Sequence, residues 1–194
     1  VLSLHQTGSG RAMVFQHGLC GDASQPAQVF PPDADFRCLT LECRGHGASP
    51  AGPVDRLSIE CFADDIADLI QSTGEGPVAL GGISMGAAIA LRLTVTRPEL
   101  VSALVLARPA WVAASAPSNM APNALVGELL RYHPPETARA LFEATATAAQ
   151  LAKVAPDNLA SLRGFFSRHP VAETAELLCR LSADGPEVSE ADIA

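Results

Sequence analysis

One stretch of the chain constrains the fold more than any other, and it runs from Pro77 to Leu91. An apolar run at its start predicts a short buried strand, and the alanine-rich run at its end predicts a helix. Between them stand Gly82, Ser84 and Gly86, in the order typical of a serine raised on a sharp turn between a strand and a helix. The glycines allow the strand and helix backbones to pass closely, because they lack Cβ atoms. Ser84 is therefore the candidate nucleophile.

Short apolar runs alternate with helical patterns four times along the first 110 residues. They predict strands near residues 13–17, 37–41, 78–82 and 103–107, and an amphipathic helix that begins at Ser58. Alternation of this kind predicts an α/β fold, a mostly parallel sheet with helices on both faces, since parallel strands need long crossover connections. Residues 1–4 are candidates for an early strand, and residues 7–10 form a turn-forming cluster.

After Trp111 the chain becomes alanine-rich and is punctuated by prolines, which predicts helices rather than further strands. The helical segments are expected at 123–132, 135–154, 156–168 and 171–182. We therefore predict a core over residues 1–110, a helical lid over 111–188 and, at 189–194, a lead-in to a further part of the core. Four aromatic residues either line an apolar pocket beneath the lid or pack the lid helices together: Trp111, Phe142, Phe165 and Phe166.

Charge and cysteine usage exclude several classes of function. Thirteen Lys and Arg against 21 Asp and Glu give a net charge of -8, with no basic cluster for nucleic acid. The longest low-charge run, 78–91, is too short to span a membrane. Five cysteines without a C-x-x-C pair indicate neither disulfides nor a metal site, and no signal peptide is evident, so we predict reduced thiols and a cytoplasmic protein. No cofactor is predicted, and the oligomeric state stays open.

Four motifs occur in an order that resembles the α/β-hydrolase superfamily. They are the His17-Gly18 loop, the Arg44-Gly45-His46-Gly47-x-Ser49 turn, the turn around Ser84, and the link Arg97-Pro98-Glu99-Leu100-Val101. The likeness covers about Ala12 to Trp111 and is closest to the small-molecule branch of lactonases, esterases, C–C bond hydrolases and cofactor-free haloperoxidases. The helical segment after Trp111 stands where that family carries its lid.

The resemblance implies a serine hydrolase that acts through an acyl-enzyme on a small, largely apolar ester, lactone or thioester. Ser84 would be the nucleophile, and the backbone N–H groups of Leu19 and Met85 would form the oxyanion hole. Structural roles fall to the residues that shape the loop and the turn: His17, Gly18, Gly82 and Gly86. His46 is expected to be structural as well, and Cys20 to be a neutral thiol. A serine at position 84 excludes the Asp-nucleophile mechanism of related dehalogenases and epoxide hydrolases.

The chain departs from the family pattern after the nucleophile, where an acid and then a histidine should follow. Only His133 and His169 come after Ser84, and both lie in the predicted lid, each before a proline. We therefore expect a C-terminally truncated member that lacks the acid and the histidine and is inactive as it stands. The alternative is a non-catalytic relative that serves as a small-molecule binding or interaction module. The intact turn around Ser84 favours the enzyme, because a binding protein gains nothing from a strained, exposed serine.

Overall fold

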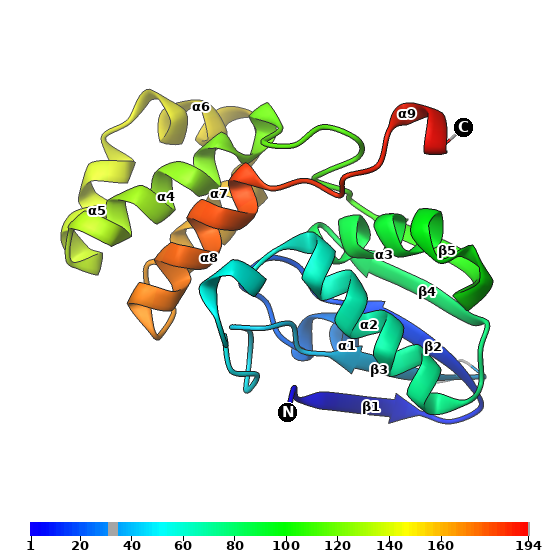
Figure 1. Ribbon diagram of the computed structural model, residues 1–194. Coiled ribbons are helices and arrows are strands. Elements are labelled where there is room, and N and C mark those ends of the chain that lie inside the picture. Colours follow the sequence, from blue (N-terminus) through cyan, green and yellow to red (C-terminus); the bar gives the residue numbers. More distant parts are fainter. Residues whose placement is uncertain (31–34, 194) are drawn as a thin grey trace. The chain divides into compact units, whose positions relative to one another are not determined.

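A computed structural model describes residues 1–30 and 35–193 of the chain. The chain divides into two compact units (Figure 1). The α/β unit comprises Val1–Ser115 and Asp184–Ala194, and the helical unit comprises Ala116–Ala183. The predicted lid, 111–188, is thus somewhat longer than the helical unit. Ala194, the end of the predicted lead-in 189–194, lies outside the described residues.

The α/β unit is built on a five-stranded sheet of order β1-β3-β2-β4-β5. Its strands are β1 (Leu4–Gly8), β2 (Arg11–Gln16), β3 (Phe36–Leu41), β4 (Val78–Ile83) and β5 (Val101–Ala107). β2 pairs in parallel with β3 and β4, and β4 pairs in parallel with β5. The prediction of a mostly parallel α/β sheet is confirmed, with all four expected strands in place.

The early strand differs from the prediction in position. β1 spans Leu4–Gly8 rather than residues 1–4, and it takes in the first half of the predicted turn at 7–10. It pairs antiparallel with β3, from Leu4 opposite Leu41 to Gly8 opposite Arg37. Pairing along the edge of β3 therefore overrides the turn preference of this glycine-containing segment, because alternate residues of β1 exchange backbone hydrogen bonds with β3.

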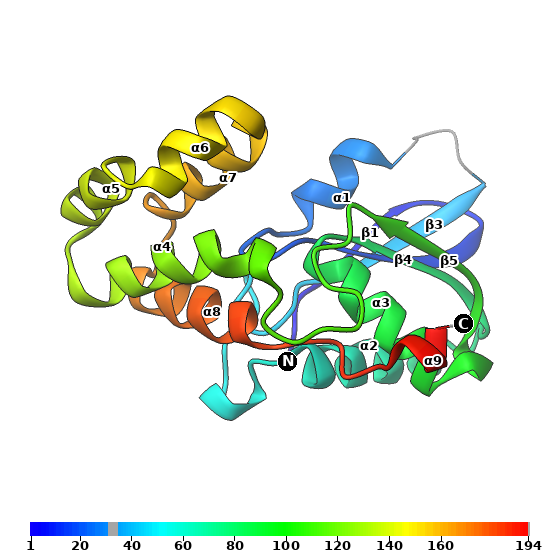
Figure 2. The same ribbon diagram turned by 90° about the horizontal axis from the view of Figure 1, so that it is seen from above.

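Helices cover both faces of the sheet (Figure 2). α2 (Ile59–Thr73) and α3 (Met85–Thr96) lie together on one face, and α1 (Ser24–Val29) lies on the other. As expected, α2 follows Ser58, whose side chain accepts the Cys61 N–H at 3.1 Å. α1 was not predicted from the sequence, because a six-residue helix that contains a proline shows no apolar period.

The last residues of the chain are fastened to the helices of the α/β unit. Asp184 accepts the Ile59 N–H at the start of α2 at 2.7 Å. Arg92 on α3 donates to the carbonyl oxygen of Pro186 at 2.9 Å and forms an ion pair with Glu187. A short helix, α9 (Glu190–Ile193), follows. These contacts explain why the segment after Ala183 belongs to the α/β unit.

The helical unit contains α4 (Ala121–Tyr132), α5 (Pro135–Glu143), α6 (Ala146–Val154), α7 (Pro156–Phe165) and α8 (Val171–Ala183). The predicted segment 135–154 is two helices, because Thr145 caps α6 by accepting the Ala148 N–H at 3.1 Å. The rings of Phe142 and Phe166 are both buried and lie 5.7 Å apart, so these two aromatics pack the helices together. Trp111 belongs to the α/β unit. No helix in the described part of the chain is long and apolar enough to cross a membrane.

β5 forms an edge of the sheet and carries exposed apolar side chains. Among the described strands it pairs with β4 alone. Val105 is 45% exposed and Leu106 is 38% exposed. The strand holds no charged residue and no proline, the usual means by which an edge is protected from pairing with another chain.

We predict that the β5 edge drives self-association and that Val105→Lys reduces it, since a charge on an open edge disfavours strand pairing. Sedimentation velocity at increasing protein concentration should show oligomers for the wild type and mostly monomer for the variant. Val54→Lys is the matched control, because Val54 is equally exposed but lies outside the sheet. A wild type that stays monomeric at high concentration would contradict the prediction.

Candidate active site

Ser84 connects the end of β4 to the start of α3 in a conformation uncommon for a residue with a side chain. Its φ is 55° and its ψ is -107°, in the positive-φ region that suits the sharp turn expected there. The N–H of Ser84 donates to the carbonyl oxygen of Ala107 at 3.0 Å, and its own carbonyl accepts the N–H groups of Ala87 and Ala88. The neighbouring strand and the first turn of α3 therefore hold the strained backbone in place.

The two glycines around Ser84, Gly82 and Gly86, lie at close contacts between backbone segments. A methyl group at Gly82 would overlap the backbone of Gly86, and a methyl group at Gly86 would overlap the carbonyl of Gln16 and crowd that of His17. Any other residue at either position would push α3 away from β2 and β4. These contacts bring the loop after β2 next to Ser84.

That loop carries one predicted oxyanion donor, and α3 carries the other. A methyl group at Gly18 would lie 3.5 Å from the Cβ of Ser84, so the loop reaches the serine. Leu19 is buried, and its N–H makes no hydrogen bond to any residue that the structure describes. Met85 is the first residue of α3, where a backbone N–H has no partner within the helix, and the Ser84 side chain does not cap it. Both N–H groups therefore remain available for a ligand.

The two histidines near the loop are fully buried, and their rings lie 4.9 Å apart. His17 Nε2 accepts the Cys43 N–H at 3.0 Å, so Nδ1 carries the proton and donates to the Gly18 carbonyl at 2.8 Å. His46 Nδ1 lies 2.9 Å from the carbonyl oxygen of Arg44. Each ring nitrogen of His17 is hydrogen-bonded to a backbone group, which leaves neither nitrogen open for a proton transfer.

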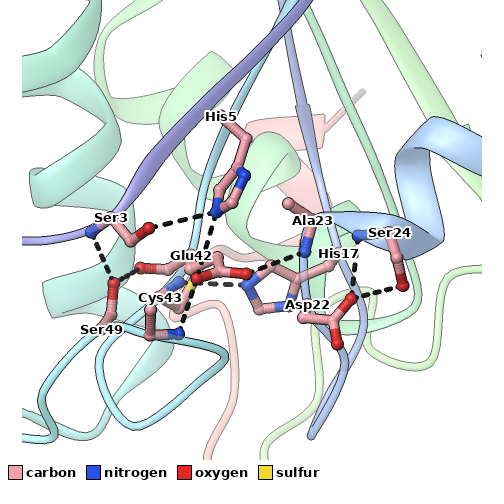
Figure 3. Close-up of polar contacts among 10 residues, drawn as sticks. Ser3, His5, His17, Asp22, Ala23, Ser24, Glu42, Cys43 and Ser49 are labelled. Carbon is pink, nitrogen blue, oxygen red and sulfur yellow. Dashed lines mark hydrogen bonds and ion pairs between the residues drawn. The ribbon is translucent and has the colours of Figure 1, made fainter.

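Glu42, at the carboxyl end of β3, is a buried carboxylate that the sequence analysis did not single out. Figure 3 shows its side chain between three other segments. It accepts the N–H of Ala48 at 2.7 Å and that of Ala23 at 3.2 Å, and it lies 3.4 Å from His5 Nε2. A methyl group at Gly47 would overlap the carboxylate. A Glu that ends a strand and precedes a glycine-rich turn was the available signal.

The surroundings of Glu42 set its protonation. Burial acts to raise the pKa of the carboxyl, but the hydrogen bonds from Ala48 and Ala23 and the nearby His5 outweigh it, so the pKa lies below its usual value. The turn that follows is fastened to α2 by Arg44, whose guanidinium donates two 2.7 Å hydrogen bonds to Asp65. Burial raises the pKa of the Cys43 thiol, which therefore stays neutral.

Among the described residues of the α/β unit, no histidine is hydrogen-bonded to the Ser84 hydroxyl. The histidines of this unit are His5, His17 and His46. His133 and His169 lie in the helical unit. In the described ranges, 1–30 and 35–193, no group of three or more His, Cys, Asp or Glu side chains is arranged to hold a metal ion.

The α/β-hydrolase fold model matches residues 11–168. The chain belongs to the α/β-hydrolase fold family. This match covers strands β2 to β5, the turn around Ser84 and most of the helical unit. The superfamily that the motifs resemble is thereby confirmed.

The curated relatives that match include a lipase and a hydrolase. The sn-1-specific diacylglycerol lipase ABHD11 of Mus musculus is 36% identical over 98 residues, which is 49% of this chain and 31% of the relative. The 2-(acetamidomethylene)succinate hydrolase of Mesorhizobium japonicum is 32% identical over 106 residues, 54% of this chain and 37% of the relative. The chain thus matches about a third of the length of these relatives. The solved structure of Rv0554 from Mycobacterium tuberculosis has a TM-score of 0.61 at 27% identity, covering 95% of this chain and 68% of that one.

We predict that Gly82→Ala lowers the free energy of unfolding of the α/β unit by about 2–3 kcal/mol, because the new methyl group overlaps the Gly86 backbone. Urea unfolding followed by the fluorescence of Trp111, the single tryptophan, measures this unit. Gly164→Ala is the control, since nothing lies within 4 Å of a methyl group there and Gly164 belongs to the helical unit. Equal unfolding midpoints for the Gly82→Ala variant and the wild type would show that Gly82 and the Gly86 backbone are not in tight contact.

A second prediction concerns Glu42→Gln. At pH 7 the variant should be about 2 kcal/mol less stable, because an amide replaces one charge-assisted acceptor and turns its NH₂ toward a backbone N–H. A carboxyl with a lowered pKa stabilises the fold above its unfolded pKa, and that contribution is lost as the pH falls through its folded pKa. The difference between wild type and variant should therefore shrink below about pH 4.

Urea unfolding at pH 7 and at lower pH values, again followed by Trp111 fluorescence, measures both effects. Glu99→Gln is the control, because Glu99 is an exposed carboxylate in the same unit. A difference between Glu42→Gln and wild type that does not change with pH would show that the charge of Glu42 is irrelevant to stability.

Proposed function

We propose that the chain carries the nucleophile and the oxyanion hole of a serine hydrolase. Ser84 is the nucleophile, and the N–H groups of Leu19 and Met85 are the oxyanion donors. The observation that carries the proposal is the positive φ of Ser84 at a strand-to-helix turn, beside a loop with an unpaired backbone N–H. Backbone strain of this kind is held by the surrounding structure and clusters at active sites.

The chemistry is acyl transfer in two steps. The Ser84 oxygen adds to the substrate carbonyl, and the hydroxyl proton passes to a base. The carbonyl oxygen becomes an oxyanion that the two N–H groups stabilise, each donor contributing about 3 kcal/mol in the transition state. The leaving alcohol or thiol departs with a proton, and water then releases the acid from the acyl-enzyme. A backbone donor survives substitution of its own side chain, so the identity of Leu19 and Met85 matters less than their position.

We assign the substrate to small, largely apolar esters, lactones or thioesters. A net charge of -8 disfavours polyanionic substrates. The hydrolases among the relatives, a diacylglycerol lipase and a hydrolase of an acetamidomethylene succinate, agree with acyl transfer as the reaction class. The free cysteines, with no disulfide among the described residues, agree with a cytoplasmic location.

The triad base and its acid are proposed to be missing from residues 1–194. His17 is used by the backbone, and no histidine of the α/β unit bonds to Ser84. That same observation supports the second candidate, a non-catalytic binding module built on the same fold. The two candidates differ in what they require of Ser84, because a binding module does not need its hydroxyl to be reactive.

We predict that residues 1–194 show no hydrolysis of p-nitrophenyl butyrate above the Ser84→Ala variant, yet bind phenylboronic acid through Ser84. The boron accepts the serine oxygen, the hydroxyl proton goes to the buffer, and the resulting anionic boronate places one oxygen in the oxyanion hole. Boron-11 NMR detects the tetrahedral adduct.

Ser102→Ala, an exposed serine on β5, is the control and should behave as the wild type. Equal boronate binding by wild type and Ser84→Ala would refute the nucleophile. Hydrolysis by the wild type above Ser84→Ala would show instead that a histidine of this chain serves as the base.

A further inference from the structure

Gly18, the residue before the proposed oxyanion donor Leu19, has both of its backbone polar groups held. Its N–H donates to Gln25 Oε1 at 2.6 Å. Its carbonyl oxygen accepts the N–H of Gly21 at 3.0 Å and the Nδ1–H of His17 at 2.8 Å. Three hydrogen bonds on a single residue leave its two peptide planes little freedom to turn.

The direction of the Leu19 N–H follows from these bonds. The peptide between Gly18 and Leu19 is planar and trans, so the Leu19 N–H points opposite to the Gly18 carbonyl. Fixing that carbonyl therefore fixes the N–H. The bond from Gly18 N–H to Gln25 holds the preceding peptide plane, and it also removes this N–H as a competing donor in the loop.

Both sets of bonds trace back to the end of β3. Cys43 donates its N–H to His17 Nε2, so the proton of the His17 ring is on Nδ1. That Nδ1–H donates to the Gly18 carbonyl oxygen. Glu42 accepts the N–H of Ala23, the residue that precedes α1 (Figure 3). Gln25 is the second residue of α1, so Glu42 anchors the short helix that presents it.

Gln25 also lies close to the serine. A methyl group at Gly18 would lie 3.3 Å from Gln25 Oε1 and 3.5 Å from the Cβ of Ser84, so both groups adjoin one face of Gly18. The Gln25 side chain contacts the Gly18 N–H, which is a donor, so the amide oxygen of Gln25 and not its nitrogen faces Gly18. The Nε2 group of Gln25 makes no hydrogen bond within the described part of the chain.

We propose that Gln25 is a positioning residue of the oxyanion hole, which holds Gly18 so that the Leu19 N–H points at the oxygen bound to Ser84. The inference rests on the proposed function of Ser84 and adds a side chain that acts through Gly18. It makes the short helix α1 part of the site, because the reach of the Gln25 side chain depends on where that helix begins.

The test compares Gln25→Met with Gln28→Met in residues 1–194. Met keeps the size of Gln and removes the acceptor, and Gln28 is an exposed glutamine on the same helix. We expect Gln25→Met to weaken phenylboronic acid binding at least tenfold, and Gln28→Met to change it less than twofold. Amide exchange measured by NMR should speed up at Gly18 in Gln25→Met alone. The shift of the Leu19 amide signal on boronate binding should be reduced only in that variant.

A second variant, Gln25→Asn, keeps the amide but shortens its reach by one methylene, and it should behave as Gln25→Met. It provides the test if Gln25→Met fails to fold, as judged by Trp111 fluorescence. Faster Gly18 exchange with unchanged boronate affinity would make the bond purely structural and overturn the proposal, as would unchanged values of both. A wild type that binds boronate no better than Ser84→Ala would instead overturn the proposed function, and the positioning role with it.

Discussion

The backbone of Gly86 packs directly against the carbonyl groups of Gln16 and His17, and the geometry of the site follows from this contact. It seats the start of α3 on the end of β2, while Gly82 allows the same turn of helix to sit on β4. Ser84 lies between these two contacts, with a positive φ of 55°. The loops after β2 and β4 meet because no side chain separates the backbones that lead into them.

A second layer of order comes from the end of β3. Glu42 and Cys43 are adjacent, yet they fix different parts of the loop after β2, one through Ala23 and α1 and the other through His17. A buried carboxylate is costly unless it is hydrogen-bonded, and Glu42 meets that condition by accepting two backbone N–H groups near His5. The polar groups of this region therefore act as a scaffold around Gly18 rather than as reacting groups.

The sequence alone indicated much of the fold and the main candidate of the site. Short apolar runs located β2 to β5, and the helical period of its apolar residues located α2. Such patterns failed for α1, which is too short to show a period, and for the limits of β1, where pairing with β3 decides the structure. Ser84 was predicted from its sequence pattern, whereas Glu42 and Gln25 were not. Glu42 accepts hydrogen bonds from residues 19 positions before it and 6 positions after it, and Gln25 accepts one from a residue 7 positions before it.

What the sequence determined by itself is local: where small residues permit a sharp turn, where apolar faces repeat, and which side chain stands at the turn. Gly82, Ser84 and Gly86 carry that information within five positions. Only the tertiary structure decided which polar groups are already engaged in hydrogen bonds. In the fold, both ring nitrogens of His17 are hydrogen-bonded to backbone groups, whereas the N–H of Leu19 has no partner among the described residues. Hydrogen bonds of this kind join distant strands, and their partners are set by the register of the sheet and the packing of α3, not by spacing along the chain.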